Sequence, residues 1–168
     1  MWYVIQTLGG EEERTADMIR RRVSSCHLEE CFVPKRERVK KFCGQWNKVD
    51  EILFPAYIFV ITDKPAELYR ELRQVPRLTK VLGREEAYFV PLSQDEERLV
   101  RSLGDQEHRT GLSKVAVEEG KKIRVLEGPL KDYAGEVVKV NLHKREAAVK
   151  VEFMGREMEL KMGIEMVR

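Results

Sequence analysis

The chain has 168 residues, of which 36% are charged and 42% are hydrophobic. This is enough apolar material for a packed core, and it excludes a chain that is disordered throughout. With 31 Lys and Arg residues against 29 Asp and Glu, the net charge is only +2, so bulk charge alone does not direct the chain to nucleic acid. A nucleic-acid role has to come from local clusters.

Several classes of protein are excluded by what the sequence lacks. The longest apolar stretch, residues 52–61, is interrupted by Pro55 and is far shorter than the roughly 20 residues of a membrane span. The first residues have neither the basic leader nor the cleavage site of a secretory signal. Three cysteines without a disulfide framework indicate reduced thiols, so we expect a cytoplasmic protein.

Chemistry-bearing motifs are also missing. The side chains that zinc prefers have a spacing that matches no structural zinc pattern. They are Cys26, His27, Cys31 and Cys43. Cys26 and His27 are neighbours that project differently on a helix, and nothing nearby supplies an oxyanion hole. We therefore expect no metal, no cofactor and no enzymatic activity.

The first segment of the chain predicts a strand followed by a helix. Residues 2–7 alternate and are rich in aromatic and β-branched side chains, which favours a strand. Three glutamates at 11–13 and three arginines at 20–22 suit the two ends of a helix dipole. The apolar residues between and after them recur at helical spacings. They are Ala16, Ile19, Val23 and Cys26.

The next segment predicts a basic hairpin and a central strand. Residues 31–42 are extended and basic, and residues 44–47 supply a turn before a second extended stretch. The most apolar run of the chain follows, and it predicts a central strand that begins after Pro55.

Two further helices and two short strands complete the first domain. Pro65 favours a helix start, and Pro76 ends that helix. A capping box of Ser93 and Glu96 predicts the start of another helix, which Gly104 ends. Short strands are expected near 78–82 and 87–90.

The C-terminal third predicts strands only. Residues 105–114 have no apolar periodicity, which favours a linker. After it the sequence alternates as half-buried strands do, at 122–127, 135–142, 146–153 and 156–161. About fifty residues of this kind favour a small closed barrel, because closure removes exposed strand edges.

The predicted fold class is therefore α+β. We expect a mixed N-terminal domain over 1–106, with an antiparallel sheet flanked by helices, a linker over 107–116, and a small all-β barrel over 117–168.

Aromatic side chains gather on adjacent parts of the predicted first sheet. They are Trp2, Tyr3, Phe54, Tyr57 and Phe59. Burial in the core is the plain interpretation, and for Phe54 and Trp2 it is as strong as exposure. However, so few helices cannot cover aromatic residues on both faces of one sheet. The sharper hypothesis is an exposed apolar depression that fits a partner helix.

Basic side chains form two clusters. The hairpin carries Lys35, Arg36, Arg38, Lys40, Lys41 and Lys48. The C-terminal domain carries Lys121, Lys122, Arg124, Lys131, His143, Lys144 and Arg145. A projecting basic hairpin can reach phosphates, although a charge run is more often a solvated face. In the second cluster, three consecutive donors at 143–145 suit the phosphates or base edges of a folded RNA, and a short polar turn is the plain alternative.

At this point the sequence resembles a family. Residues 2–7 (WYVIQT), 53–60 (LFPAYIFV) and 75–83 (VPRLTKVLG) resemble the N-terminal domain of the NusG transcription elongation factors. Residues 119–137 look like a KOW motif. The resemblance spans nearly the whole chain in the family's order. It implies an NGN-like first domain and an SH3-like KOW barrel.

The resemblance also implies a partner for the first domain. That partner is the pair of clamp helices of the largest RNA polymerase subunit. By position, Phe54 and Tyr57 would anchor the helix pair, and Trp2 and Phe59 would surround them. Tyr69 and Arg70 would face the pincer of the polymerase that lies across its cleft from the clamp helices. Such a factor works by differential affinity for the closed clamp and needs no cofactor; we expect a monomer.

Departures from the family pattern point to a specialised member. In general NusG factors the barrel contacts a termination helicase or a small-subunit ribosomal protein through exposed groups near the positions of Leu130, Phe153, Met154 and Arg156. Here the usual Gly after Phe-Pro is Ala56, and Lys144 and Arg145 make the barrel loop more basic. Residues 76–80 and the short hairpin are most similar to the LoaP paralogues of NusG. This resemblance implies an antiterminator that recognises a leader RNA hairpin.

Three functions remain open. The first is an operon-specific elongation factor that binds RNA polymerase and promotes processive antitermination, with its KOW domain on a leader RNA hairpin. The second is a housekeeping NusG-type factor whose KOW domain binds protein partners. The third is a ribosome-associated RNA-binding protein, which leaves the aromatic residues of the first domain unexplained.

Overall fold

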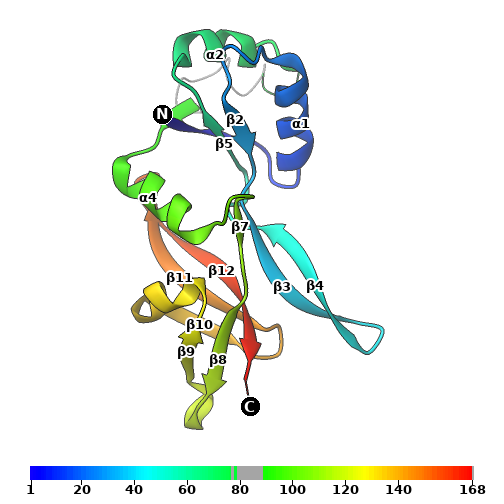
Figure 1. Cartoon of the computed structure of the whole chain (residues 1–168), viewed down its shortest axis with the longest axis vertical. Coiled ribbons are helices and arrows are strands. Elements are labelled where there is room, and N and C mark those ends of the chain that lie inside the picture. The colour runs from blue at the N-terminus through cyan, green and yellow to red at the C-terminus, as the bar shows by residue number, and fades with distance from the viewer. Residues whose placement is uncertain (77, 79–88, 168) are drawn as a thin grey trace. The chain divides into compact units, whose positions relative to one another are not determined.

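The computed structural model of the chain describes residues 1–76, 78 and 89–167 (Figure 1). The chain divides into two compact units, residues 1–34 with 54–97 and residues 35–53 with 98–168. The hairpin over 35–53 therefore groups with the C-terminal strands, whereas the sequence analysis placed it in the first domain. The predicted domain boundaries at 106 and 117 stay a prediction.

The first unit is a four-stranded antiparallel sheet with helices, in the order β2-β5-β1-β6. Its strands are β1 (Trp2–Gln6), β2 (Glu30–Phe32), β5 (Tyr57–Ile61) and β6 (Phe89–Pro91). Its helices are α1 (Glu12–Arg22) and α2 (Pro65–Leu72), and α4 (Gln94–Leu103) spans the point at which the units divide. The central strands β1 and β5 supply much of the core.

Helix α1 forms where the sequence predicts it. Acidic residues occupy its first turn and arginines its last, which complements the helix dipole. Ala16, Ile19 and Val23 are buried as expected. Cys26 is exposed and lies beyond the end of the helix, so its assignment to the apolar face is wrong. The helix ends at Arg22, before that position is reached.

The other two helices also begin at their predicted signals. Pro65 is the first residue of α2. At the start of α4 the Ser93 Oγ accepts the Glu96 N–H at 3.2 Å, and the Glu96 carboxylate accepts the Ser93 N–H at 3.0 Å, so the capping box is confirmed. The strand expected near 78–82 falls, except for residue 78, outside the described residues.

The second unit contains the predicted hairpin, but its first strand begins at Lys35 and its turn lies at 43–44 and not at 44–47. Strands β3 (Lys35–Phe42) and β4 (Gln45–Ile52) pair along all eight residues. The two turn residues, Cys43 and Gly44, have φ values of 51° and 81°. Two positive φ values are what a type I′ turn requires, and this turn matches the twist of a tight hairpin. Strand β7 (Arg109–Thr110) pairs with β3 in parallel.

The C-terminal strands form one five-stranded sheet in the order β10-β11-β12-β8-β9. They are β8 (Ser113–Val117), β9 (Ile123–Glu127), β10 (Val137–Asn141), β11 (Glu146–Phe153) and β12 (Arg156–Met166). Two 3-10 segments join them, η2 (Glu119–Lys121) and η3 (Pro129–Glu136), and η3 contacts both β9 and β11. With the mixed first unit, this small β domain confirms the α+β fold class.

The segment expected as a linker is structured. Strands β7 and β8 lie inside or overlap 107–116, so the expectation of an irregular segment there is wrong. Two of its polar residues, Thr110 and Ser113, are buried, and the Ser113 Oγ accepts the N–H of Leu130 at 2.9 Å. Small polar side chains in a strand carry no apolar periodicity, which explains the error.

No helix among the described residues has the length and apolar character needed to cross a lipid bilayer.

Candidate functional site

Aromatic rings pack on one another along one face of the first unit's sheet. Phe32 and Val4 both lie opposite Phe59 in the strand register, so they share its face. The Phe32 and Phe59 rings are 5.6 Å apart, and the Trp2 ring meets Phe32 edge-on at 5.3 Å. Phe54 meets Phe59 at 5.4 Å. These contacts make a continuous aromatic cluster.

All five aromatic residues expected around an exposed depression are buried. Trp2 is 7% exposed, Tyr3 8%, Phe54 0%, Tyr57 4% and Phe59 0%. The expectation of an open depression lined by these residues is therefore wrong. The physical reason for Trp2, Phe54 and Phe59 is that ring-on-ring packing removes them from solvent without a helix over each one.

A hollow does exist, but on the opposite face of the same sheet. It has a volume of about 310 Å³ and is lined by Tyr3, Pro65, Ala66, Tyr69 and Phe89; we call it the aromatic hollow. Tyr3 neighbours Val4 along β1, so its side chain projects from the other face. The Phe89 ring stacks at 4.9 Å on Tyr3 and at 5.9 Å on Tyr69.

Sequence reasoning found part of the aromatic hollow. Tyr69 was a candidate, and it is half-buried at the wall. Arg70 was a candidate too, and it is exposed beside Tyr69. Phe89 was missed as a site residue, because only the pairing of β6 with β1 brings it next to Tyr3. That pairing joins residues more than eighty positions apart, and the local sequence pattern does not predict it.

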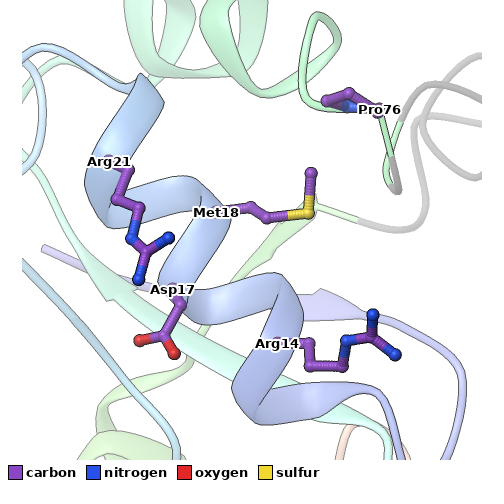
Figure 2. A pocket seen from close by; sticks show the side chains of 5 residues that line it. All are labelled: Arg14, Asp17, Met18, Arg21 and Pro76. Carbon is purple, nitrogen blue, oxygen red and sulfur yellow. The ribbon is translucent and has the colours of Figure 1, made fainter.

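A second, larger groove runs along α1 (Figure 2). It has a volume of about 580 Å³, and Figure 2 shows the side chains that line it. They are Arg14, Asp17, Met18, Arg21 and Pro76. Asp17 pairs with Arg20 at 2.7 Å, which neutralises part of the local charge. The groove offers a thioether between guanidinium groups and was not predicted.

The turn before β5 is fastened to the start of α1. Ala56 has a φ of 72°, in the left-handed region that favours glycine. Its N–H donates to the buried Glu12 carboxylate at 2.9 Å, and the Gly10 N–H donates to the same carboxylate at 3.0 Å. Ala56 is therefore a strained residue whose backbone N–H is bound by a buried acid.

Two of the basic hairpin residues are occupied in ion pairs. Arg36 donates to Glu51 at 2.7 Å and to Glu146 at 3.0 Å. Arg38 lies 3.0 Å from Glu51 and 3.2 Å from Glu146. Arg36 and Glu146 are buried. The four side chains form a closed set, which we call the ion-pair ring, so a phosphate-binding role for Arg36 and Arg38 is not supported.

The ion-pair ring sets the charge state of its most exposed acid. Burial alone would raise the pKa of Glu51, but the Arg36 and Arg38 guanidinium groups outweigh it and hold that pKa below its ordinary value. Glu51 therefore stays ionised into mildly acidic solution, and both arginines keep a charged partner.

The loop at 143–145, which we call the basic loop, joins β10 to β11. His143 and Lys144 are exposed, and Arg145 is half-buried. The Lys144 N–H donates to Asn141 Oδ1 at 3.0 Å. The Arg145 guanidinium lies 4.4 Å from the centre of the Trp46 ring, in cation-π geometry. The loop is thus a defined turn with two basic side chains in solvent.

The other predicted RNA-binding residues lie elsewhere in the sheet. Lys122, which directly precedes β9, and Arg124 of β9 are exposed, and Lys131 is exposed in η3. Arg124 pairs with Glu118 at 3.6 Å. Lys121 ends η2. Because β9 and β10 are the two ends of the strand order, strand pairing does not bring this group and the basic loop together.

The apolar groups through which a housekeeping barrel would contact proteins are mostly not exposed. Leu130 and Phe153 are 0% exposed. Met154 is half-buried, and Arg156 is exposed. The expectation that Leu130 and Phe153 are exposed contact groups is therefore wrong, because both side chains are core residues of the second unit.

The four residues with zinc-ligand side chains have separate environments. Burial raises the pKa of the Cys31 thiol to about 12, while Cys26 and Cys43 are exposed. The His27 Nδ1 lies 2.9 Å from the Glu71 carboxylate. Within the described part of the chain, no three His, Cys, Asp or Glu side chains come together as a metal site would require.

Comparisons with known proteins identify the family. The family described as "Transcription termination factor nusG" matches residues 1–101. The chain is 31% identical to the transcription termination/antitermination protein NusG of Pasteurella multocida, over 92% of this chain and 87% of that protein. It is 30% identical to the protein of the same name from Thermus thermophilus, over 99% of this chain and 96% of that protein.

A solved structure supports the same assignment over both units. The structure described as "Domain interaction in Thermotoga maritima NusG" matches with a TM-score of 0.55 and 26% identity, over 96% of this chain and 92% of that chain. The chain therefore belongs to the NusG family and is a NusG-type transcription termination/antitermination factor.

Proposed function

We propose that this protein is an operon-specific antitermination factor that binds RNA polymerase with its first unit and a leader RNA hairpin with its C-terminal sheet. The observation that carries the first half is the aromatic hollow with the adjoining Arg70. The basic loop supports the second half. Family membership supports a role in transcription but does not distinguish an operon-specific factor from a general one.

RNA polymerase binds at the aromatic hollow in this proposal. The hollow combines three aromatic rings with the apolar Pro65 and Ala66, and an apolar recess with a polar rim is the surface that a partner helix fills. Arg73 places its guanidinium 5.9 Å from the Tyr69 ring, and Arg70 is exposed next to Tyr69 in the sequence, so two basic side chains lie beside this wall of the hollow. The clamp helices of the largest subunit are the proposed partner. The buried cluster of Trp2, Phe54 and Phe59 supports the sheet beneath the hollow.

RNA binds at the basic loop. His143 and Lys144 are exposed on a turn in which the Lys144 N–H donates to the Asn141 side chain, so both side chains project into solvent from a defined turn. Folded RNA is read through loops and bulges by such donors and by phosphate contacts. Leu130 and Phe153 are buried, so the housekeeping alternative would have to use other apolar residues for its protein contacts.

The polymerase contact is tested by replacing Tyr69 with Ala and measuring the affinity of the full chain for purified RNA polymerase. Loss of one wall of the hollow weakens binding about tenfold, as removal of an aromatic anchor commonly does. The matched control is Tyr133→Ala, a half-buried tyrosine of the second unit. Equal affinity of Tyr69→Ala and wild type, with both folded, contradicts a polymerase contact at this hollow.

Operon specificity is tested by deleting the gene and sequencing all transcripts. If the factor is operon-specific, its deletion lowers the distal transcripts of a few long operons only, whereas broad changes across the genome indicate the housekeeping function.

The RNA-binding half of the proposal is tested by Lys144→Ala, with Lys64→Ala in the first unit as a charge-matched control. RNA that co-purifies with the wild-type chain should be lost from Lys144→Ala alone, and its retention contradicts the role of the basic loop.

A further inference from the structure

The tip of the hairpin and the basic loop meet in the second unit. The Arg145 guanidinium stacks over Trp46, which lies in β4 next to the turn, at 4.4 Å from the ring centre. The Nη2 of Arg38, in β3, donates to the Lys144 carbonyl oxygen at 3.5 Å. Two basic stretches that are about a hundred residues apart in the sequence are therefore neighbours in space.

The ion-pair ring and close backbone contact hold this arrangement. Glu146 directly follows the basic loop, and it binds both Arg36 and Arg38 of the hairpin. Strand β12 runs so close to β3 that a Cβ at Gly163 would overlap the carbonyl oxygen of Glu37. Buried charges with several partners and a glycine contact fix the position of the hairpin.

The charges at the hairpin tip are unbalanced. Residues 35–52 carry six basic and three acidic side chains. Of the acids, Glu51 belongs to the ion-pair ring and Asp50 pairs with Arg109 at 2.8 Å. Lys40, Lys41 and Lys48 are exposed. They make no ion pair with any residue of the described ranges.

Exposed aromatic rings lie among these lysines. Phe42 is 70% exposed and Trp46 is 43% exposed. Lys41 lies directly opposite Trp46 in the register, and Phe42 lies opposite Gln45 at the turn. One side of the Trp46 ring carries the Arg145 guanidinium, and the exposed remainder can accept a further flat group.

We propose that the hairpin tip and the basic loop form one binding surface for unpaired bases of RNA. In this surface a base stacks on Trp46, whose other side holds Arg145, and Lys41, Lys48 and Lys144 contact the flanking phosphates. Exposed aromatic rings between lysines are the combination that binds single strands, because every base offers a stacking face and every nucleotide a charge. The proposal rests on the RNA-binding function proposed above and extends it from the loop to the hairpin.

The test measures binding of the full chain to two fluorescein-labelled probes, a single-stranded RNA of mixed sequence and the fully paired duplex of that sequence, at fixed salt. Trp46→Ala weakens single-strand binding about tenfold and duplex binding less than about twofold, because only unpaired bases can stack. Trp46→Phe keeps a ring at the position and restores most of the affinity. Lys64→Ala is the control, and thermal unfolding of each variant establishes that it is folded.

A direct readout comes from the indole itself. In a Trp2→Phe background Trp46 is the only tryptophan, and base stacking quenches its fluorescence during titration with the single strand. Quenching by the single strand and not by the duplex supports the proposal.

The outcomes separate this proposal from the one on which it rests. If Lys144→Ala weakens RNA binding and Trp46→Ala does not, the basic loop binds RNA alone and the shared surface is overturned. If neither variant weakens binding, both proposals are overturned. If the wild-type chain binds RNA polymerase subunits through Trp46 and neither RNA probe, the surface is a protein contact and the proposal is again overturned.

Discussion

The two units fasten their strands with different chemistry. In the first unit, Trp2, Phe32, Phe54 and Phe59 pack ring against ring and leave no charge in the cluster. In the second unit, the ion-pair ring joins the hairpin to the start of β11 through four charge contacts. Apolar packing is indifferent to pH and depends on shape, whereas a buried ion pair stabilises only when every partner is present and ionised.

In each unit the fastening lies close to aromatic residues for which we propose a partner. The sheet that carries the aromatic cluster presents the aromatic hollow on its other face. The ion-pair ring positions the hairpin whose tip presents Trp46. In both units the residues proposed to contact partners lie outside the fastening itself. The predictions below separate the two kinds of fastening.

The largest effect is expected from Phe59→Ala. Removing a ring that is 0% exposed costs about 4 kcal/mol of unfolding free energy, through lost burial and the cavity that remains. Urea unfolding of the first unit is followed by Trp2 fluorescence in a Trp46→Phe background. The control is Phe42→Ala, an exposed ring whose loss should change stability by less than about 0.5 kcal/mol. Equal effects of the two changes would disprove the aromatic cluster.

The next largest effect is expected at the ion-pair ring. Glu146→Gln leaves the buried Arg36 with one carboxylate in place of two, which lowers the free energy of unfolding by about 2 kcal/mol. Trp46 fluorescence in a Trp2→Phe background reports on this unit. Glu157→Gln, at an exposed pair with Lys150, is the control and should cost less than about 1 kcal/mol. If Glu146→Gln lowers the free energy of unfolding no more than Glu157→Gln does, the ion-pair ring does not hold the hairpin in place.

A smaller and opposite effect is expected at Ala56. Replacing it with Gly relieves a φ of 72° and stabilises the first unit by about 1 kcal/mol. The Glu12 contact is made by the backbone N–H, so it survives the change. The same Trp2-based urea titration measures it, and a destabilised Ala56→Gly variant would contradict strain at this turn.

The smallest effect is a pH dependence confined to the second unit. The pKa of Glu51 is lowered in the folded chain from its ordinary value of 4.5, so the folded state binds fewer protons than the unfolded state in that range. The stabilisation is fully present above pH 4.5 and is lost as the pH falls through the lowered pKa. Glu51→Gln removes this dependence. An unchanged acid profile in that variant would assign the dependence to other groups.

Local patterns in the sequence predicted most of the elements. The capping box of Ser93, the acidic start of α1 and the alternation over residues 149–153 of β11 are short-range signals, and the structure confirms them. The buried or exposed state of the aromatic residues could not be predicted, because it depends on which rings meet across strands. The pairing of Tyr3 with Phe89 and of Arg36 with Glu146 joins distant parts of the chain, and no local periodicity encodes such contacts.

The account depends most on RNA polymerase meeting the first unit at the aromatic hollow. Hydrogen–deuterium exchange of the full chain, free and bound to RNA polymerase, tests this without any substitution. We predict slowed exchange on binding at residues 66–69 of α2 and 89–90 of β6. Unchanged exchange in both segments, with protection only in the second unit, would contradict the account.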